Sequence, residues 1–304
     1  MSNAPSVPNG PDTGDAIVDW YARAARDLPW RRPDVDAWAV LVSEVMLQQT
    51  PVARVEPVWR DWMARWPTPA ALAAVSPADV IRAWGKLGYP RRALRLREAA
   101  VAVVERHDGV VPDDVAALEA LPGVGTYTAR AVACFGYGQP QPVVDTNVRR
   151  VVARLLHGRA EAATARASDL ADVVALTPPD RARAARFSVA AMELGALVCV
   201  AGTPRCGACP VRDRCAWVRA GSPPYDGPAR RVQKFAGTDR QVRGRLLDVV
   251  RAAHHPVTAG ELDAAWDDAV QRSRCLDSLL TDGLVEQTPA GHFILPTGNV
   301  DHAS

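Results

Sequence analysis

The glycine-rich stretch LPGVGTYTARAVACFGYGQPQPVVDTNVRR, residues 121–150, constrains the fold more than any other part of the 304-residue chain. The segment before it, PDDVAALEA, predicts a short helix with an aspartate as its N-cap. Pro122 and the glycines that follow end this helix and turn the chain, and a helical pattern resumes at Thr126. The stretch therefore predicts two helices joined by a tight hairpin.

The backbone amides of Gly123, Val124 and Gly125 are expected at the N-terminus of the second helix. Free N–H groups and the positive end of the helix dipole attract a phosphate at such a position. A nucleotide-binding P-loop is disfavoured, because neither a Gly-Lys-Ser/Thr ending nor a preceding strand accompanies the glycines. A phosphate-binding hairpin and a helical corner with glycine for tight packing remain as alternatives.

The overall charge does not point to a nucleic-acid partner, because the formal net charge is only +2. Between Arg82 and Arg97, however, the chain carries six basic residues and no acidic one. Such a run is either a solvated helix face or a phosphate-binding face.

Apolar residues recur at helical spacing along most of the chain. Asp15–Arg26 and Trp38–Gln49 are the first two helix candidates, and the later ones mostly begin near a proline or a capping residue. No convincing strand pair precedes residue 280. These patterns predict an all-α domain of short helices, with further candidates at 51–66, 69–74, 77–84, 89–107, 126–135, 148–156 and 181–197.

One carboxylate, Glu44, lies among apolar residues in the segment WAVLVSEVMLQQ. Burial of this group in its charged form, without a partner, would be costly. Either Glu44 lies on an exposed stripe of its helix, or burial raises its pKa by up to about 3–5 units and makes it a general acid.

Four of the six cysteines form a cluster with the spacing Cys199-x6-Cys206-x2-Cys209-x5-Cys215. In a chain without a secretion signal, such a cluster favours a metal site over disulfides. Four thiolates in one short loop can hold a [4Fe–4S] cluster or a zinc ion, although only one C-x2-C pair is present. Cys134 and Cys275 stand apart, and we expect them to pack in the core.

Several of these segments together resemble the adenine DNA glycosylases of the MutY type: LPWR, SEVMLQQT, WGKLGYPRRALRL, LPGVG with the later VVDTNVRR, and the cysteine spacing. The resemblance covers roughly residues 15–220. It implies a two-lobed helix-hairpin-helix fold in which Gly123, Val124 and Gly125 bind a DNA backbone phosphate. It also implies a structural [4Fe–4S] cluster on the four clustered cysteines.

The resemblance also assigns the catalytic groups. Glu44 would protonate N7 of the departing adenine, and Asp145 would stabilise the positive charge of the sugar or attack it. Asn147 would orient Asp145. Considered alone, Asp145 is better explained as an ordinary helix N-cap. Glycosylases with lyase activity carry a Schiff-base lysine where this chain has Tyr127, so the resemblance implies a monofunctional enzyme.

Further matches concern the two mispaired bases. Trp30 and Arg31 correspond to the adenine pocket of the family. The wedge and the 8-oxoguanine contacts of the family correspond to four other residues, Gln49, Thr50, Leu87 and Tyr89.

The chain departs from the family pattern in three respects. Pro90 replaces a frequent second tyrosine, and Val189 stands where a glutamine or glutamate often contacts adenine. The segment after residue 237 is too short for the Nudix-like domain that helps the family to recognise 8-oxoguanine. The details of base recognition therefore do not follow from the resemblance.

That last segment predicts a small winged-helix-like module. Helical patterns precede the apolar and polar segment GLVEQTPAGHFILP, which suggests two short strands. A packing module without a DNA role is the alternative. The predicted division is a disordered tail at 1–14, the glycosylase region at 15–220 with its cysteine loop at 199–215, a linker at 221–237, the module at 238–296 and a tail at 297–304.

The sequence predicts no transmembrane helix and no apolar signal core. We therefore expect a cytoplasmic, nucleoid-associated monomer that binds double-stranded DNA with a mispaired adenine. Its predicted function is base excision repair, by hydrolytic removal of adenine opposite 8-oxoguanine and also opposite guanine. The alternatives are an endonuclease III-like glycosylase/lyase for oxidised pyrimidines, which Tyr127 disfavours, and a non-catalytic DNA-binding iron–sulfur protein, which the joint presence of Glu44 and Asp145 disfavours.

Overall fold

The computed structural model describes residues 11–227 and 235–298. The chain divides into two compact units. Unit 1 falls within Met1–Glu44, Pro112–Ala120 and Val124–Pro228, and unit 2 falls within Val45–Val111, Leu121–Gly123 and Ala229–Ser304. The predicted tails and linker lie partly outside the described residues, at 1–10, 228–234 and 299–304.

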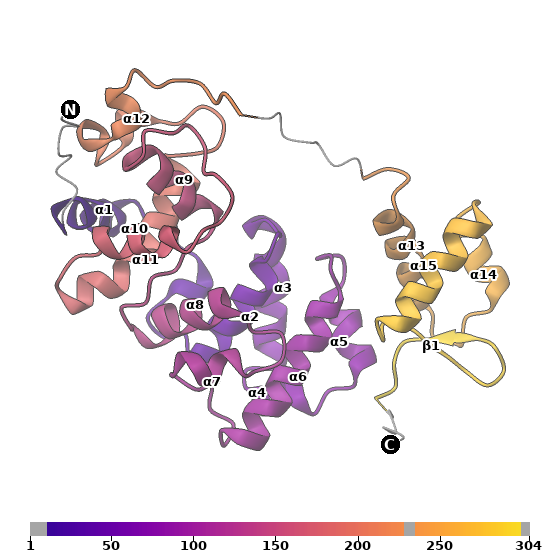
Figure 1. The fold of residues 1–304 in the computed structure, drawn as a ribbon. Helices are drawn as coiled ribbons and strands as arrows, with labels where there is room; N and C mark the ends of the chain where they lie inside the picture. The colour runs from indigo at the N-terminus through magenta and orange to yellow at the C-terminus, as the bar shows by residue number, and fades with distance from the viewer. Residues whose placement is uncertain (1–10, 228–234, 299–304) are drawn as a thin grey trace. The chain divides into compact units, whose positions relative to one another are not determined.

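The predicted all-α class is confirmed, and most helices begin and end within a few residues of their expected bounds (Figure 1). Unit 1 contains the helices α1 (Pro11–Ala24), α7 (Val115–Glu119), α8 (Thr126–Tyr137), α9 (Thr146–Leu155), α10 (Ser168–Leu176), α11 (Arg181–Leu197) and α12 (Ala216–Arg219), and the 3-10 turns η1 (Pro29–Arg31), η2 (Cys206–Ala208) and η3 (Arg212–Arg214). Helix α2 (Ala37–Leu47) begins in unit 1 and ends in unit 2. Unit 2 contains α3 (Val52–Arg65), α4 (Pro69–Ala73), α5 (Pro77–Trp84), α6 (Arg91–Arg106), α13 (Asp239–Ala252), α14 (Ala259–Asp263), α15 (Ala269–Thr281) and the strands β1 (Glu286–Gln287) and β2 (Phe293–Ile294).

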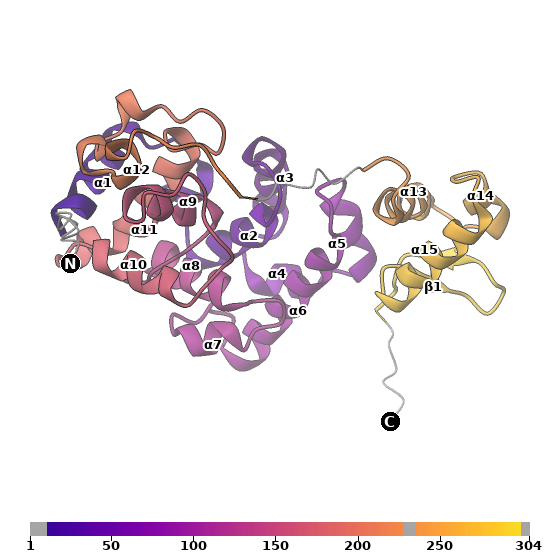
Figure 2. The same ribbon diagram turned by 45° about the horizontal axis from the view of Figure 1, so that its top comes forward.

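Helix α11 packs against α1, α8 and α9 and forms much of the core of unit 1. Figures 1 and 2 both show α9, α10 and α11 side by side. The core joins Phe187 and Leu194 of α11 to Ile17 of α1 and Val151 of α9. Because α11 is apolar on most sides, neighbouring helices can cover it from several directions.

Helix α1 begins at Pro11, so residues 11–14 belong to a helix and not to the predicted disordered tail. Thr13 is fully buried in this additional turn. A Cβ atom on Gly14 would collide with the carbonyl oxygen of Leu176, so glycine permits the close approach of α1 to α10. Composition alone could not show this packing.

The predicted hairpin connects α7 and α8. Asp114 caps α7 by accepting a hydrogen bond from the backbone N–H of Ala117 at 2.9 Å. Gly123 has a φ of +75°, and a Cβ atom there would lie 2.7 Å from the Cβ of Arg95. The turn therefore requires glycine at this position. Gly125 is the N-cap of α8 and supplies no side-chain cap, which leaves the first amides of that helix without one.

The C-terminal part of unit 2 has the predicted order of three helices followed by two short strands. The strands are antiparallel, with Glu286 paired to Ile294 and Gln287 to Phe293. Val257, which precedes α14, forms a further bridge to Phe293. The order of these elements agrees with the predicted one, and the segment belongs to unit 2.

This module shares its core with α5. Ile81 of α5 is fully buried among residues of α13 and α15, including Leu246 and Leu279. Within the described residues, no helix combines the length and the apolar character that crossing a membrane requires.

The close packing of α11 on the start of α9 gives a test of the fold. A Cβ atom on Gly195 of α11 would lie 2.7 Å from the Cβ and 2.8 Å from the carbonyl oxygen of Asn147. We predict that Gly195→Ala destabilises the protein by about 1–3 kcal/mol, because the overpacking exceeds the gain in helix propensity. Urea denaturation followed by circular dichroism measures the effect.

Gly244→Ala is the matched control. Gly244 is exposed within α13, and a Cβ atom there would have no neighbour within 4 Å. This variant should be more stable than the parent by about 0.5–1 kcal/mol. Equal stabilisation by both substitutions would show that α9 can shift to make room for a side chain and that glycine is not required at position 195.

Candidate active site

Glu44 is buried on α2, with 7% of its surface exposed, so the exposed-stripe alternative does not apply. The hydroxyl of Tyr127, in the first turn of α8, donates a hydrogen bond to its carboxylate. Burial raises the pKa of Glu44 to about 7, although the positive charge of Arg31 and the hydrogen bond from Tyr127 favour the ionised form. The carboxyl group is therefore partly protonated at neutral pH.

Asp145 is the N-cap of α9. Its Oδ1 accepts a hydrogen bond from the backbone N–H of Val148 at 2.7 Å, and its Oδ2 accepts one from the side-chain amide of Asn147 at 2.7 Å. Burial raises the pKa of Asp145, and these hydrogen bonds act in the opposite direction. Its negative charge also raises the pKa of Glu44, so the two carboxyl groups influence each other. Its capping role is therefore compatible with a chemical role.

Asn147 is held on its other side by a buried arginine. Its Oδ1 accepts a hydrogen bond from Nη2 of Arg150 at 2.8 Å, and the same nitrogen donates to the carbonyl oxygen of Gly195 at 2.7 Å. Because its oxygen faces a donor, Asn147 presents its amide nitrogen to Asp145. Sequence reasoning missed Arg150, because the basic pair in NVRR looks like an ordinary helix surface.

Glu193 is a second residue of the candidate site that sequence reasoning missed. It is fully buried on α11 and accepts hydrogen bonds from Nε of Arg26 and Nη1 of Arg31, each at 2.7 Å. Although burial acts in the opposite direction, the two arginines lower the pKa of Glu193 to about 2. Glu193 is an acidic residue within the apolar segment AAMELGAL. The same kind of pattern indicated Glu44 and could have indicated Glu193.

The residues expected in an adenine pocket lie in the same unit. Trp30 and Arg31 form part of the turn η1, where Trp30 is buried and Arg31 is fixed by Glu193. Val189 lies half-buried on α11. It has no polar group with which to contact a base.

The four clustered cysteines lie in the loop after α11, through η2 and η3. The pKa of Cys209 is raised to about 11, first by burial and then by the neighbouring Cys199, Cys215 and Cys206. The other three thiols of the cluster thus lie close enough to Cys209 to affect its ionisation. Among residues 11–227 and 235–298, no three His, Cys, Asp or Glu side chains surround the position of one metal ion.

Two buried arginines of α9 face this loop. Nε of Arg150 donates to the carbonyl oxygen of Cys199 at 2.7 Å, and Nη1 of Arg154 lies 3.4 Å from the sulfur of Cys199. Both arginines also donate to backbone carbonyl oxygens, and the negative charges of Glu161 and Asp145 act on Arg150. Buried cations need a negative partner, and thiolates bound to a metal cluster would supply one.

The other two cysteines are buried in different places. Cys134 of α8 donates to the carbonyl oxygen of Ala185 at 3.2 Å, and burial raises its pKa to about 12. Cys275 belongs to the core of the C-terminal module. Both placements agree with the expected packing roles.

Gln49, Thr50, Leu87 and Tyr89 lie together in unit 2. The hydroxyl of Tyr89 donates to Oε1 of Gln49 at 3.0 Å, and the hydroxyl of Thr50 lies 3.4 Å from the carbonyl oxygen of Leu87. Gln49 and Tyr89 have φ values of +54° and +49°. Such left-handed backbone costs on the order of 1–3 kcal/mol at a non-glycine residue and persists only where other contacts hold it.

Arg92 supplies those contacts, and sequence reasoning did not identify it. Its Nη1 donates to the carbonyl oxygens of Val45 and Gln48 at 2.8 and 2.6 Å, and its Nη2 donates to Thr50 and to the carbonyl oxygen of Gly88 at 3.1 and 2.9 Å. The guanidinium therefore ties the C-terminal end of α2 to the loop that carries Tyr89. A cation is favourable at a helix C-terminus.

The basic run at 82–97 divides into two inward-pointing arginines and four solvent-exposed basic residues. Arg92 points inward, and Arg97 donates to the carbonyl oxygens of Val75 and Ala73. The other four residues of the run pair with acids from elsewhere in the unit, namely Arg82 with Asp79, Lys86 with Asp248, Arg91 with Asp282 and Arg95 with Glu98.

The geometry of unit 1 suits one class of chemistry. A carboxyl group that stays protonated near pH 7 can give a proton to a leaving group. A second carboxylate nearby can stabilise a sugar cation, as in glycoside hydrolysis. Glu44 suits the role of proton donor, and Asp145 suits the role of the second carboxylate.

Comparison with known proteins places the chain among DNA repair enzymes. Residues 42–174 match the model of the family described as HhH-GPD superfamily base excision DNA repair protein. The chain is 64% identical to the adenine DNA glycosylase of Mycobacterium tuberculosis over 92% of both chains. It is 61% identical to the adenine DNA glycosylase of Mycolicibacterium smegmatis over 92% of this chain and 94% of that one.

A solved structure of a thermostable thymine-DNA glycosylase has a similar fold. The two structures superpose with a TM-score of 0.61 and 25% sequence identity, over 68% of this chain and 95% of that one. The helical architecture of about two thirds of the chain therefore recurs in another glycosylase.

The unusual pKa of Glu44 predicts how stability depends on pH. Because the pKa rises from its ordinary value of 4.5 to about 7 on folding, folding favours the protonated form. Stability should be highest below about pH 4.5 on this account and should fall as the pH rises to about 7. Glu44→Gln should remove this fall and be more stable than the parent at pH 8, by up to about 3 kcal/mol.

Glu193→Gln is the control of opposite sign. Since the pKa of Glu193 is lowered to about 2, its contribution is present at neutral pH and is lost only as the pH falls towards 2. This variant should be less stable than the parent at pH 7. Urea midpoints from pH 5 to 8 test both, and an unchanged pH dependence in Glu44→Gln would contradict the assignment.

Proposed function

Because the chain belongs to the HhH-GPD superfamily of base excision DNA repair proteins and to its adenine DNA glycosylase branch, we propose that this DNA glycosylase removes adenine mispaired with 8-oxoguanine, and also with guanine. The reaction is hydrolysis of the N-glycosidic bond. The partner is double-stranded DNA, which a monomer would bind in the cytoplasm, at the nucleoid. The observation that carries the proposal is the buried, partly protonated Glu44 in the same unit as Asp145.

Adenine within a duplex is inaccessible, so the enzyme must extrude it at a cost of a few kcal/mol. Glu44, in its protonated form, donates a proton to N7 of adenine and makes the base a better leaving group. Asp145, held by Asn147 and Val148, stabilises the positive charge that develops on the sugar. Trp30 and Arg31 line the pocket for the extruded adenine, and the fixed position of Arg31 favours a defined geometry.

Tyr127 separates this activity from that of a lyase. It occupies the position of the Schiff-base lysine of bifunctional glycosylases, and a phenol cannot form a Schiff base. Its hydrogen bond to Glu44 instead holds the proton donor in place. The backbone of Gly123, Val124 and Gly125 binds a DNA phosphate at the start of α8, where the amides have no side-chain cap.

The cysteine loop fits a [4Fe–4S] cluster held by Cys199, Cys206, Cys209 and Cys215. A zinc ion would draw four sulfurs to about 2.3 Å from one point, whereas each thiolate of a four-iron cluster binds a different iron atom. The cluster would hold the loop in one conformation, and Arg150 and Arg154 would offset its negative charge.

The first test uses a labelled duplex with adenine opposite 8-oxoguanine. Half of the product is heated in alkali, which breaks the strand at an abasic site, and half is not. Strand breaks only in the heated half indicate base removal without lyase chemistry. Breaks in both halves would support the endonuclease III-like alternative, and intact strands with DNA bound would support the non-catalytic one.

Two conservative variants test the assigned residues. Glu44→Gln and Asp145→Asn should each lower the single-turnover rate by about 10²–10⁴-fold, while asparagine preserves the N-cap of α9. The wild-type rate should fall as the pH rises through about 7, because Glu44 must be protonated. Full activity in both variants would refute this chemistry.

Metal content tests the cysteine loop independently of activity. The purified protein should be brown, with visible charge-transfer absorption and about four irons per chain. Cys209→Ser should lose this absorption and be less stable, whereas Cys275→Ser should keep the absorption. A colourless protein that contains zinc would refute the cluster.

A further inference from the structure

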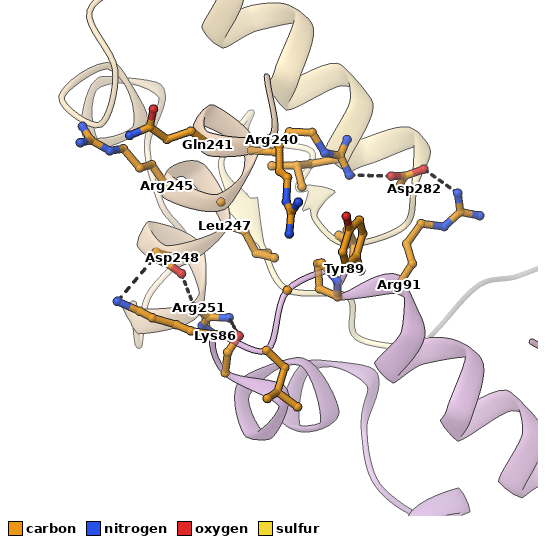
Figure 3. A pocket seen from close by; sticks show the side chains of 18 of the residues that line it. Lys86, Tyr89, Arg91, Arg240, Gln241, Arg245, Leu247, Asp248, Arg251 and Asp282 are labelled. Carbon is orange, nitrogen blue, oxygen red and sulfur yellow. Dashed lines mark hydrogen bonds and ion pairs between the residues drawn. The ribbon is translucent and has the colours of Figure 1, made fainter. Parts of the chain in front are cut away.

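Two cavities are lined by neither Glu44 nor Asp145. The larger one, of about 660 Å³ in unit 2, contains Tyr89 (Figure 3). Tyr89 already belongs to the expected contacts with the mispaired bases, so this cavity adds no further site. The smaller one, of about 110 Å³, lies wholly within unit 1, where the chain passes from α9 to α10.

The smaller cavity has the size and the charge for a small anion. Its volume is far below the range of about 300–1,000 Å³ that is typical of small-molecule sites, so it can admit a phosphate group but not a nucleoside. Three arginines and one histidine line it, but only two carboxylates do. The lining is therefore positively charged overall, which favours an anionic ligand.

Both carboxylates of the lining already have a basic partner. Oδ2 of Asp169 accepts a hydrogen bond from Nε of Arg149 at 2.7 Å, and Oδ2 of Asp172 lies 2.7 Å from Nε2 of His157. Arg149 also donates to the carbonyl oxygen of Ala163. These contacts fix Arg149 and join α9 to the loop and to α10, so they form a defined wall of the cavity.

Arg159 and Arg166 supply the remaining positive charge. Both are exposed, and neither side chain takes part in a hydrogen bond or an ion pair among residues 11–227 and 235–298. Arg166 lies just before α10, whose N-cap, Ala167, gives no side-chain cap to the first amides of the helix. Guanidinium groups beside such amides suit a phosphate group, which arginine binds with paired hydrogen bonds.

Helix α9 connects this cavity to Asp145. Arg149 follows Asp145 by four residues, so the two lie on the same face of the helix, about 6 Å apart along its axis. The backbone N–H of Arg149 donates to the carbonyl oxygen of Asp145 at 3.0 Å. In DNA a phosphate adjoins each sugar on either side. A sugar held against Asp145 would therefore bring one of its own phosphates towards the cavity.

We propose that this cavity binds a backbone phosphate of the strand that carries the extruded adenine, and that Arg159 and Arg166 are its contacts. The proposal rests on the proposed function, which places the sugar at Asp145. The contact holds the extruded nucleotide beside Asp145, whatever base lies opposite. Free inorganic phosphate has the same chemistry, and the experiment below separates the two sources.

The test uses duplexes in which one phosphate at a time, on either strand, is replaced by an uncharged methylphosphonate. The adenine is 2′-fluorinated, which prevents its excision. Wild-type binding should weaken at a position next to the adenine. Arg159→Gln and Arg166→Gln should each weaken binding to the unmodified duplex by about 3- to 30-fold. Both variants should bind the duplex modified at that position as tightly as the wild type does, because the contact is already lost.

Two further variants are matched controls. Arg159→Lys should keep most of the binding, because lysine also binds phosphate as a point charge. Arg181 is exposed on α11 and does not line the cavity. Arg181→Gln loses the same charge but should weaken binding little, with no dependence on the position of the methylphosphonate. Thermal melting of each variant checks that the fold is intact.

Three results would overturn the proposal. Equal losses for Arg159→Gln with every modified duplex would indicate a general effect of charge, and unchanged binding would show that DNA does not reach the cavity. Calorimetric binding of inorganic phosphate to the wild type but not to Arg159→Gln, with no methylphosphonate effect, would indicate a site for a free anion. Failure of the proposed function is distinguishable, since the wild type would then not excise adenine from an ordinary duplex, whereas the phosphate contact is measured without excision.

Discussion

The burial of carboxyl groups in unit 1 is the constraint on which the proposed site depends. Glu44 and Glu193 lie on apolar helices and are both buried, yet their pKa values move in opposite directions. Glu193 accepts hydrogen bonds from two arginines and stays ionised, whereas Glu44 receives one from a tyrosine and keeps its proton near neutral pH. Both side chains are glutamates, and their hydrogen-bond partners decide whether the carboxyl group stays ionised and binds arginines or keeps its proton and can act as an acid.

Local signals in the sequence predicted much of the fold and of the site. The glycine turn at Gly123 and the N-cap at Asp145 depend on a few neighbouring residues and lie where the pattern places them. The pattern singled out Glu44 but left open whether it is buried, and the structure shows that it is. Partners far along the chain were not predictable. Arg31 is 162 residues from Glu193, and periodicity carries no information about such pairs. Helix α10 was not among the predicted helices.

The partners of the basic run at 82–97 in unit 2 were also not predictable from local sequence. Its spacing fits a phosphate-binding face as well as a solvated one, but its members pair with acids or with backbone carbonyl groups. Arg92 makes the largest set of such contacts, and they hold the strained residues Gln49 and Tyr89 beside each other. The role of Arg92 becomes visible only in the structure, where the C-terminal end of α2 lies beside the loop that carries Tyr89.

The burial of Ile81 has a consequence for limited proteolysis of the protein. Residues 221–227, which precede the C-terminal module, are exposed, so a protease can cut the chain there. The cut would not by itself release the module, because α13 and α15 still cover the apolar side of α5 around Ile81. Separation would expose that surface to water and favour aggregation. Nicked protein should therefore migrate as one particle on a native column and as two fragments in detergent.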